Sequence, residues 1–317
     1  MTRDDADRHA TSRGVFDGRS FRRMSPDFTT ARHAAARGET RGMADVIDTP
    51  TLLSARYGVT ADDEALRLDD SGTIRGLLAH RSVRAFDRRP IEPAIVDTLI
   101  AAAQSASTSS NLQSWSVVVV RDETHKSAVA TLAGDQQFIR EAPLFLVFVA
   151  DWARGAAISR SRGEAAEGIE YFDSTLVATI DAAIAAQNAV VAAESLGLGA
   201  VFVGAVRNRP DELSALLGLP DASYPVVGVA VGWPDHANPA RVKPRLPQSV
   251  VRHDERYSPA SVDDLADYDD ALRLFNESQG RTGSWLDAVV ARVRSRSALH
   301  GRERLRSILS SRGLPSA

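Results

Sequence analysis

Thr179-Ile-Asp-Ala-Ala-Ile-Ala-Ala-Gln-Asn-Ala-Val-Val-Ala-Ala-Glu-Ser-Leu196 is the longest helix signal in the sequence. The segment is rich in alanine and apolar nearly all round, with Ile180, Ile184 and Val191 spread over its surface. A helix of this kind is buried rather than amphipathic, and its small side chains let neighbouring backbones approach closely. We therefore expect either the central core helix of one subunit or a helix that packs against its own copy in a dimer.

Four runs of mainly β-branched residues surround this helix and predict strands, at residues 116–121, 144–150, 200–204 and 226–232. Because the runs are apolar without alternation, both faces of the sheet should be covered by helices. Further helices are predicted at residues 51–57, 71–79, 91–103, 269–275 and 291–309. Gly197 and Gly199 match the first two glycines of the Gly-x-Gly-x-x-Gly motif that binds dinucleotides, but the third glycine would fall at Phe202. The glycines here also follow a predicted helix and precede a strand, whereas in that motif they follow a strand and precede a helix. This turn is therefore predicted to be a helix C-cap.

Composition narrows the class of protein. A chain of 317 residues with 44% hydrophobic content can bury a large core in one or two domains. A net charge of −3 does not indicate a nucleic-acid-binding surface, and no apolar run is long enough to predict a membrane span. There is no cysteine and the seven histidines are scattered, so no metal site is predicted. With no secretory signal in sight, these features favour a cytoplasmic protein.

The start of the chain differs from the rest. Residues 1–42 carry nine Arg against six Asp and Glu with no helical or strand period, and they predict a disordered N-terminal tail. A targeting presequence is a rival interpretation that the acidic residues disfavour. Met43 opens a more ordinary segment and is an alternative start to Met1. We expect a main domain over residues 43–275 and a C-terminal loop and helical extension over residues 276–317.

The stretch His80-Arg-Ser-Val-Arg-Ala-Phe86 brings two guanidinium groups, an imidazole and a hydroxyl into one small volume. Guanidinium forks match the oxygens of a phosphate, and charge-assisted hydrogen bonds are strong. A solvated basic turn is the plain alternative. Lys243-Pro-Arg245 offers two more cations on a segment stiffened by proline, and with the first stretch it would make a phosphate site. Other polar groups gather in the Ser/Thr loop at 105–115, at Gln136, and at 204–207.

Several motifs in order identify a resemblance to a known family. They are the stretch at 80–86, Ser-Thr-Ser-Ser-Asn-Leu-Gln at 107–113, Ala-Gln-Asn-Ala at 186–189, Ala-Glu-Ser-Leu-Gly-Leu-Gly at 193–199, Val-Gly-Trp-Pro at 231–234, and Lys-Pro-Arg-Leu-Pro at 243–247. The chain resembles the nitroreductase superfamily of FMN enzymes over residues 76–285. Within it, the match is to the class-A type, the oxygen-insensitive NADPH nitroreductases and NADPH–flavin oxidoreductases.

The resemblance implies an α+β fold: a three-layer α/β/α sandwich with a mixed, mostly antiparallel sheet, and a homodimer with long interface helices. It also implies a set of FMN contacts in this chain. The phosphate and ribityl end would be held by His80, Arg81, Ser82, Lys243 and Arg245, and Arg84 would face the pyrimidine edge. Ser107 and Ser109 would approach the ring or the ribityl chain, and Gln136 would contact the ribityl hydroxyls. The ring itself would lie along Val203, Gly204 and Ala205. Relatives often have two glycines where this chain has Gly204-Ala205, which makes the backbone beside the flavin N5 a point of difference.

The resemblance further implies the activity: FMN takes hydride from NADPH and passes it to nitroaromatics, quinones or free flavin in a ping-pong cycle, and no side chain need act as catalytic acid or base. The alternative is an FMN-binding carrier or sensor without turnover, which fold alone does not distinguish. The 2′-phosphate of NADPH needs a cation, and Arg281, between Gly280 and Gly283, is the best match to the NADPH-binding arginine of relatives. An ordinary exposed arginine is the alternative, and Arg292 and Arg296 are competing cations.

Overall fold

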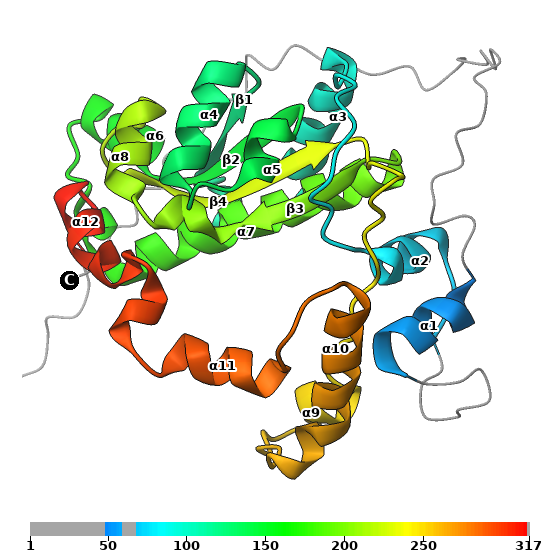
Figure 1. Cartoon of the computed structure of the whole chain (residues 1–317). Helices are drawn as coiled ribbons and strands as arrows, with labels where there is room; N and C mark the ends of the chain where they lie inside the picture. The colour runs from blue at the N-terminus through cyan, green and yellow to red at the C-terminus, as the bar shows by residue number, and fades with distance from the viewer. Residues whose placement is uncertain (1–47, 59–67, 316–317) are drawn as a thin grey trace, which may run out of the picture. The chain divides into compact units, whose positions relative to one another are not determined.

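A four-stranded sheet with the order β1-β2-β4-β3 carries the fold (Figure 1). The computed structural model describes residues 48–58 and 68–315, all of which belong to one unit, residues 40–317. The strands are β1 (Trp115–Val120), β2 (Leu144–Asp151), β3 (Gly199–Val203) and β4 (Ser223–Gly232), each pairing antiparallel to its neighbour. All four predicted strands are confirmed. The predicted tail at 1–42 lies outside the described residues, and the domain boundaries remain predictions.

Helices cover both faces of the sheet, which confirms the three-layer prediction. Leu144, Leu146 and Phe148 of β2 face the core shared with α3 (Pro93–Gln104) and α7 (Phe172–Ser195). Phe145 and Val147 point the other way, because successive side chains of a strand alternate. They meet the second core, which is closed by α4 (Glu123–Leu132), α5 (Gln137–Glu141) and α8 (Pro210–Leu216). These three helices and α6 (Ala153–Ser161) were not predicted.

Helix α7 begins at Phe172, seven residues before its predicted start. Its alanines at positions 178, 182, 185, 186, 189 and 193 are buried against the sheet. Among the described helices only α7 is long and apolar enough to cross a membrane by length and composition. Burial of this alanine face explains the composition, as expected for a core helix. Gly197, with φ of 81°, ends the helix, and the predicted C-cap is confirmed.

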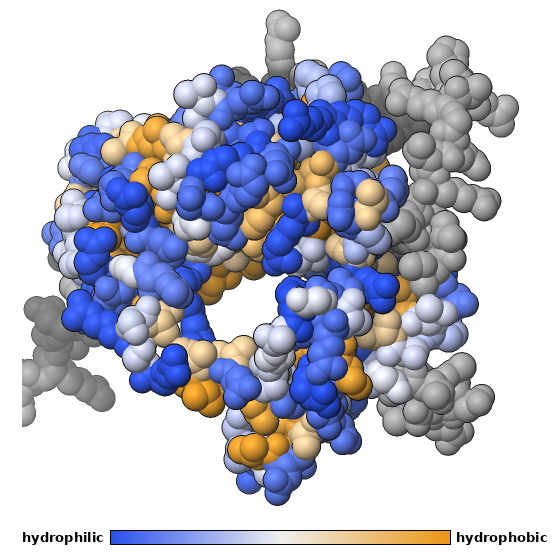
Figure 2. Space-filling view, viewed as in Figure 1, coloured by the Kyte–Doolittle hydropathy of each residue, from blue (hydrophilic) through white to orange (hydrophobic). Residues whose placement is uncertain are grey.

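The opposite face of α7 is apolar but uncovered. Phe172, Leu176, Ile180 and Ile184 recur every four residues and are between 40% and 56% exposed. Residues at this spacing share one side of a helix, so they form a continuous stripe. Figure 2 shows apolar surface beside the opening that separates the sheet layers from α10 (Ala266–Ser278) and α11 (Trp285–Val293). We call these four residues the α7 stripe.

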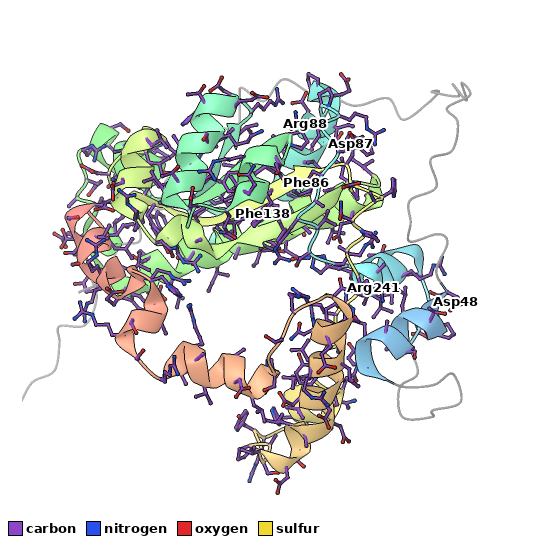
Figure 3. All side chains as sticks on the ribbon, in the orientation of Figure 1. Asp48, Phe86, Asp87, Arg88, Phe138 and Arg241 are labelled. Atoms are coloured by element: carbon purple, nitrogen blue, oxygen red, sulfur yellow. The ribbon has the colours of Figure 1, made fainter. Side chains whose placement is uncertain are left out.

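The segment after α1 (Thr49–Tyr57) and α2 (Gly72–Ala79) crosses the end of the sheet. Ser82 forms an isolated parallel bridge with Ala200, which gives the sheet its mixed character, and the Val83 N–H donates to the Ala200 carbonyl at 3.0 Å. Two glycines permit this close approach. A Cβ on Gly199 would come within 2.7 Å of Val83, and one on Gly232 within 2.7 Å of Phe86 (labelled in Figure 3). A Cβ on Gly228 would similarly meet Phe145 at 2.4 Å.

The C-terminal segment contains α9 (Gln248–Val251), α10, α11 and α12 (Leu305–Ser311). The prediction of one helix over residues 291–309 is wrong, because the chain breaks between α11 and α12. His300 and Gly301 have φ of 52° and 92°, which no helix accommodates. After α12, Arg312 donates to the carbonyls of Ser223 at 2.9 Å and Pro220 at 2.8 Å, and Leu309 and Leu314 are buried in the α7-side core. The end of the chain is therefore anchored to the start of β4.

Candidate functional site

Cations from three distant segments meet beside the end of the sheet. Burial lowers the pKa of Lys243, and the neighbouring charges of Arg84, Arg281 and Arg245 lower it further. Arg56 lies next to Arg245, and burial followed by that charge lowers the pKa of Arg56 to about 10. Within the described part of the chain, none of these side chains forms an ion pair with a carboxylate. We call Arg56, Arg84, Lys243, Arg245 and Arg281 the cationic cluster.

Arg56 joins the two halves of this site. Its guanidinium donates to the carbonyls of Leu78 at 2.9 Å and Lys243 at 3.0 Å, and also to the carbonyl of His80. The Arg245 N–H donates in return to the Arg56 carbonyl at 2.7 Å. The segments around His80 and Lys243, more than 160 residues apart in sequence, are thus held side by side through their backbones.

The first basic segment is braced by an acid from α7. Glu194 Oε1 lies 2.7 Å from Nδ1 of His80 and fixes the imidazole orientation. Burial lowers the pKa of Arg81, and the charge of Glu194 raises it. Arg81 also donates to the Ala79 carbonyl at 3.0 Å, while Ser82 is held in the bridge to Ala200. His80, Arg81 and Ser82 therefore lie on a fixed backbone beside the cationic cluster.

Arg84 connects the cluster to the second layer of helices. Its guanidinium lies 5.9 Å from the ring centroid of Phe138 on α5 (labelled in Figure 3), and Gln136 caps that helix. Burial lowers the pKa of Arg84, and the charge of Arg281 lowers it further. The turn before α5 brings Gln136 near Ala205, because a Cβ on Gly134 would lie 3.9 Å from the Gln136 amide and 3.5 Å from the Ala205 methyl.

Val203, Gly204 and Ala205 form the turn at the end of β3, where Val203 is buried and the next two residues are partly exposed. A Cβ on Gly204 would lie 3.4 Å from Nη2 of Arg207, so Arg207 lies directly beside this turn. Arg207 itself donates to the Val226 carbonyl. The turn therefore presents its backbone on a rigid base, close to Gln136.

The Ser/Thr loop lies elsewhere. Its anchor is Asp181 of α7, whose carboxylate accepts from the N–H groups of Ser109 at 3.0 Å and Ser114 at 3.2 Å. The loop leads into Trp115, which lies opposite Ala150, whereas Ala200 lies beside the other end of β2, across Val231 from Leu144. Six residues of strand separate the two ends, about 20 Å at ~3.4 Å per residue. Ser107 and Ser109 are therefore not brought to the cationic cluster within one chain.

Arg281 does reach the cluster, and the competing cations do not. Its guanidinium lies 5.9 Å from the ring centroid of Phe275, and its charge acts on Arg84 and Lys243. The loop is held by Asn276, whose amide donates to the Gly283 carbonyl at 3.0 Å. Arg292 instead lies near Arg207 and Arg302, whose pKa values are lowered first by burial and then by neighbouring arginines, Arg292 among them. Arg296 approaches Glu303 at 3.9 Å.

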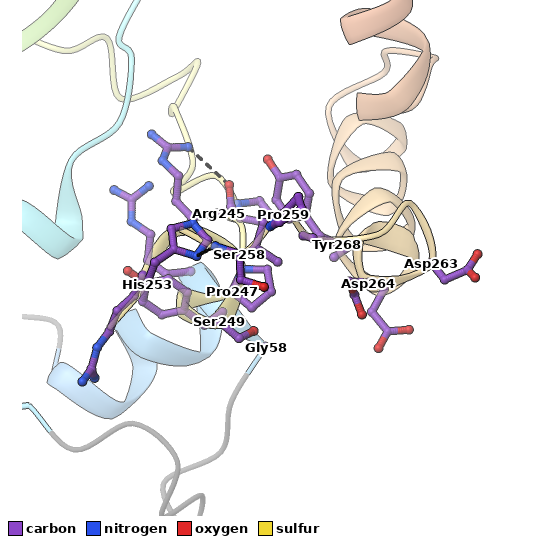
Figure 4. Close-up of a pocket in the computed structure, with 18 of the residues that line it drawn as sticks. Gly58, Arg245, Pro247, Ser249, His253, Ser258, Pro259, Asp263, Asp264 and Tyr268 are labelled. Atoms are coloured by element: carbon purple, nitrogen blue, oxygen red, sulfur yellow. Dashed lines mark hydrogen bonds between the residues drawn. The ribbon is translucent and has the colours of Figure 1, made fainter. Parts of the chain in front are cut away.

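A pocket that is lined partly by Arg56 and Arg245 differs in charge from the rest of the cluster. It has a volume of about 1070 Å³ and is lined by the end of α1, residues 244–260 and the start of α10 (Figure 4). Arg245 and Tyr268 lie on its wall, together with Asp254, Asp263 and Asp264. Such mixed charge does not select an anion, whereas all five side chains of the cationic cluster carry the same sign of charge.

Four contributors were missed from sequence. Arg56 and Glu194 frame the basic segments, Asp181 anchors the Ser/Thr loop, and Phe138 packs beside Arg84. An acid within the apolar Ala-rich helix was a usable signal for Asp181, since an ionised group is rarely buried without partners. Glu194 lies in the same helix and offered the same signal, whereas Arg56 and Phe138 act through contacts between distant segments, for which the sequence holds no local signal.

The donor set of this site fits a phosphorylated cofactor. Cations that repel one another and form no ion pair with a carboxylate are costly to hold together, and an anion with several acceptor oxygens relieves that cost. The hydroxyl of Ser82 and the backbone N–H groups of the 203–205 turn add uncharged donors nearby. FMN has this chemistry, with a terminal phosphate at one end and a polar ring edge at the other.

Comparison with known proteins adds independent evidence. Residues 77–233 match the model of the nitroreductase family, and residues 243–317 match that of the family's C-terminal domain. NADPH-flavin oxidoreductase of Vibrio harveyi is 36% identical over 247 residues, covering 77% of this chain and 98% of that protein. Oxygen-insensitive NADPH nitroreductase of Salmonella typhimurium is 37% identical over 222 residues, covering 69% and 90%.

A solved structure agrees with these relatives. NADPH:FMN oxidoreductase from Vibrio harveyi, complexed with NAD+, superposes with a TM-score of 0.69 at 36% identity. The match covers 77% of this chain and 99% of that one. The α+β fold class and the resemblance drawn from the motifs are both confirmed. Because the two family models match in order and the relatives are covered almost from end to end, this chain belongs to the nitroreductase family.

Proposed function

We propose that the protein is an FMN-dependent oxidoreductase that uses NADPH to reduce small-molecule acceptors such as nitroaromatics, quinones or free flavin. The observation that carries the proposal is the cationic cluster, whose members lie close enough to lower the pKa of Lys243 and form no ion pair with a carboxylate among the described residues. Names of the relatives support the same class of activity, since they are NADPH-flavin oxidoreductases and NADPH nitroreductases.

In this proposal the chain's own residues bind and orient the cofactor. His80, Arg81, Ser82, Lys243 and Arg245 hold the phosphate end. Arg84 faces the pyrimidine edge of the ring, where a cation stabilises the negative charge of the reduced form. Gln136 contacts the ribityl chain, and the backbone of Val203, Gly204 and Ala205 lies along the ring. When bound, FMN supplies the redox chemistry by accepting hydride from the nicotinamide and passing it on.

We further propose a homodimer. The α7 stripe exposes four large apolar side chains in a row, and contiguous apolar surface of this kind marks an interaction site. A second copy also resolves the position of the Ser/Thr loop. The loop that carries Ser107 and Ser109 leads into the end of the sheet opposite the basic segments, about 20 Å away by strand length, so these serines are better placed to contact a flavin bound by the partner. We place the enzyme in the cytoplasm, in agreement with its lack of cysteine.

For the nicotinamide substrate, we propose that Arg281 binds the 2′-phosphate of NADPH. Arg281 is exposed and its guanidinium lies over the ring of Phe275. It also lies near Arg84 and Lys243, so a nucleotide bound by Arg281 would be close to the proposed cofactor site. Guanidinium groups bind phosphate through two parallel hydrogen bonds, which suits this role.

The test separates the enzyme from a carrier or sensor. The purified protein should be yellow and hold FMN in preference to FAD. On mixing with NADPH in a stopped-flow instrument, the visible absorbance of the bound flavin should bleach, and adding a quinone should restore it. Flavin that binds but does not bleach would favour the carrier or sensor. A colourless protein that takes up no FMN would contradict both.

A further inference from the structure

Helix α1 is an addition to the matched family core, since the family models begin at residue 77. It is nevertheless well formed and packed. Asp48 caps its first turn by accepting from the Thr51 N–H at 2.8 Å, and Gly58, with φ of 69°, ends it. Leu52 is only 1% exposed and Arg56 only 4%. The chain therefore places an extra helix against the cationic cluster.

The contacts of α1 converge on one residue. Arg56 donates to the carbonyls of Leu78 and His80 on one segment and to the carbonyl of Lys243 on the other. The Arg245 N–H closes the arrangement by donating to the Arg56 carbonyl. Arg56 therefore hydrogen-bonds to both segments through one guanidinium group.

The site needs such a connection. Lys243, Arg245 and Arg84 repel one another, and this repulsion favours separation of the two segments when no anion is bound. Arg56 bonds only to carbonyl oxygens and so leaves the side chains of the two segments available to a ligand. A guanidinium suits this task because its planar fork can donate to several carbonyls at fixed angles.

We propose that Arg56 is a positioning residue of the cofactor site: from a helix outside the family core, it fixes the spacing of the 78–80 and 243–245 segments so that together they bind a phosphate group. The inference rests on the proposed FMN site. It predicts that Arg56 contributes to recognition of the phosphate and not to recognition of the flavin ring.

The experiment compares FMN with riboflavin, which lacks the phosphate, by titration of flavin fluorescence against the apoprotein. Wild-type protein should prefer FMN strongly. Arg56→Met and Arg56→Lys should each reduce the ratio of FMN to riboflavin affinity at least tenfold, with riboflavin affinity nearly unchanged. The lysine variant keeps the charge and preserves folding, but it loses the fork that reaches both segments.

Lys126→Met is the matched control. Lys126 is also 4% exposed and donates to a single backbone carbonyl, that of Ala142, but it lies on α4 and hydrogen-bonds to neither basic segment. It should lower stability and leave the affinity ratio unchanged. A wild-type ratio in Arg56→Lys would overturn the positioning role and leave only a charge effect, and an unchanged ratio in both Arg56 variants would refute any role. Wild-type protein that binds neither flavin would instead refute the proposed function, and this inference with it.

Discussion

Replacing Asp181 by alanine should loosen the Ser/Thr loop. The carboxylate is 1% exposed and accepts from two loop N–H groups, at 3.0 Å and 3.2 Å. The loop is strained, because Ser110, Asn111 and Gln113 have φ between 50° and 56°. Side chains other than glycine rarely adopt this region, so the conformation depends on bonds that hold it.

The expected loss follows from these contacts. Two hydrogen bonds to a charged group contribute about 3–6 kcal/mol together, at ~1.5–3 kcal/mol each. The freed loop can relax some of its left-handed residues, which cost ~1–2 kcal/mol each, so about 1–3 kcal/mol of the loss is recovered. We therefore expect Asp181→Ala to lower the free energy of unfolding by about 2–3 kcal/mol, or the melting temperature by about 5–10 °C. Asp181→Asn keeps one acceptor oxygen, so its free energy of unfolding should lie between that of the wild type and that of Asp181→Ala.

Urea unfolding followed by circular dichroism, at one fixed protein concentration, measures this loss. Asp173→Ala is the control, because Asp173 is an exposed residue in the first turn of the same helix. It should cost no more than about 1 kcal/mol. If Asp181→Ala fell within 1 kcal/mol of this control, the carboxylate would not be the anchor of the loop. Because the loop is proposed to reach the partner's flavin, FMN affinity should fall as well.

Four further outcomes test the proposals. Replacing Lys243 and Arg245 together by alanine should release most of the FMN, measured by absorbance after gel filtration, and full retention would exclude them as phosphate ligands. Ile180→Asp should convert a dimer to a monomer by light scattering, because it places a charge within the α7 stripe; an unchanged mass would show that the stripe is not the interface. Arg281→Ala should raise the KM for NADPH at least tenfold, about 1.4 kcal/mol, and leave NADH unaffected, whereas equal losses would indicate loop closure. Deleting residues 1–42 should change the melting temperature by less than about 5 °C; a larger drop would show that the tail packs on the fold.

The sheet and its covering were predictable because burial leaves a strong mark on sequence. Continuous β-branched runs gave all four strands, and the Ala-rich helix was recognised from its composition. That helix was predicted to begin too late, since Phe172 and Leu176 belong to the exposed stripe, whose apolar character depends on a partner. Two alternatives were left open for this helix, a core helix of one subunit or a helix at a dimer interface. One face of the helix is buried in the core, and the other face is proposed to pack against a second copy of the chain.

Errors arose where local preference is decided by distant contacts. The Arg-rich C-terminal stretch has helical composition, yet its break at His300-Gly301 fits a close approach to another segment. A Cβ on Gly301 would lie 2.8 Å from the Asn208 carbonyl. This close approach depends on the position of residues 207–209, so the sequence near residue 301 alone does not indicate it. Arg56 was overlooked for the same reason, since its acceptors lie more than 20 and 180 residues away. For the site, the motifs identified candidate ligands, but the residues that brace them came only from the structure.

The glycines at the end of the sheet have a consequence for engineering. Gly199 and Gly232 let residues 83 and 86 lie directly on the strands, so any side chain at either position would push the basic segment away from the sheet. Saturation libraries at these two positions should yield almost no active clones, however mild the substitution.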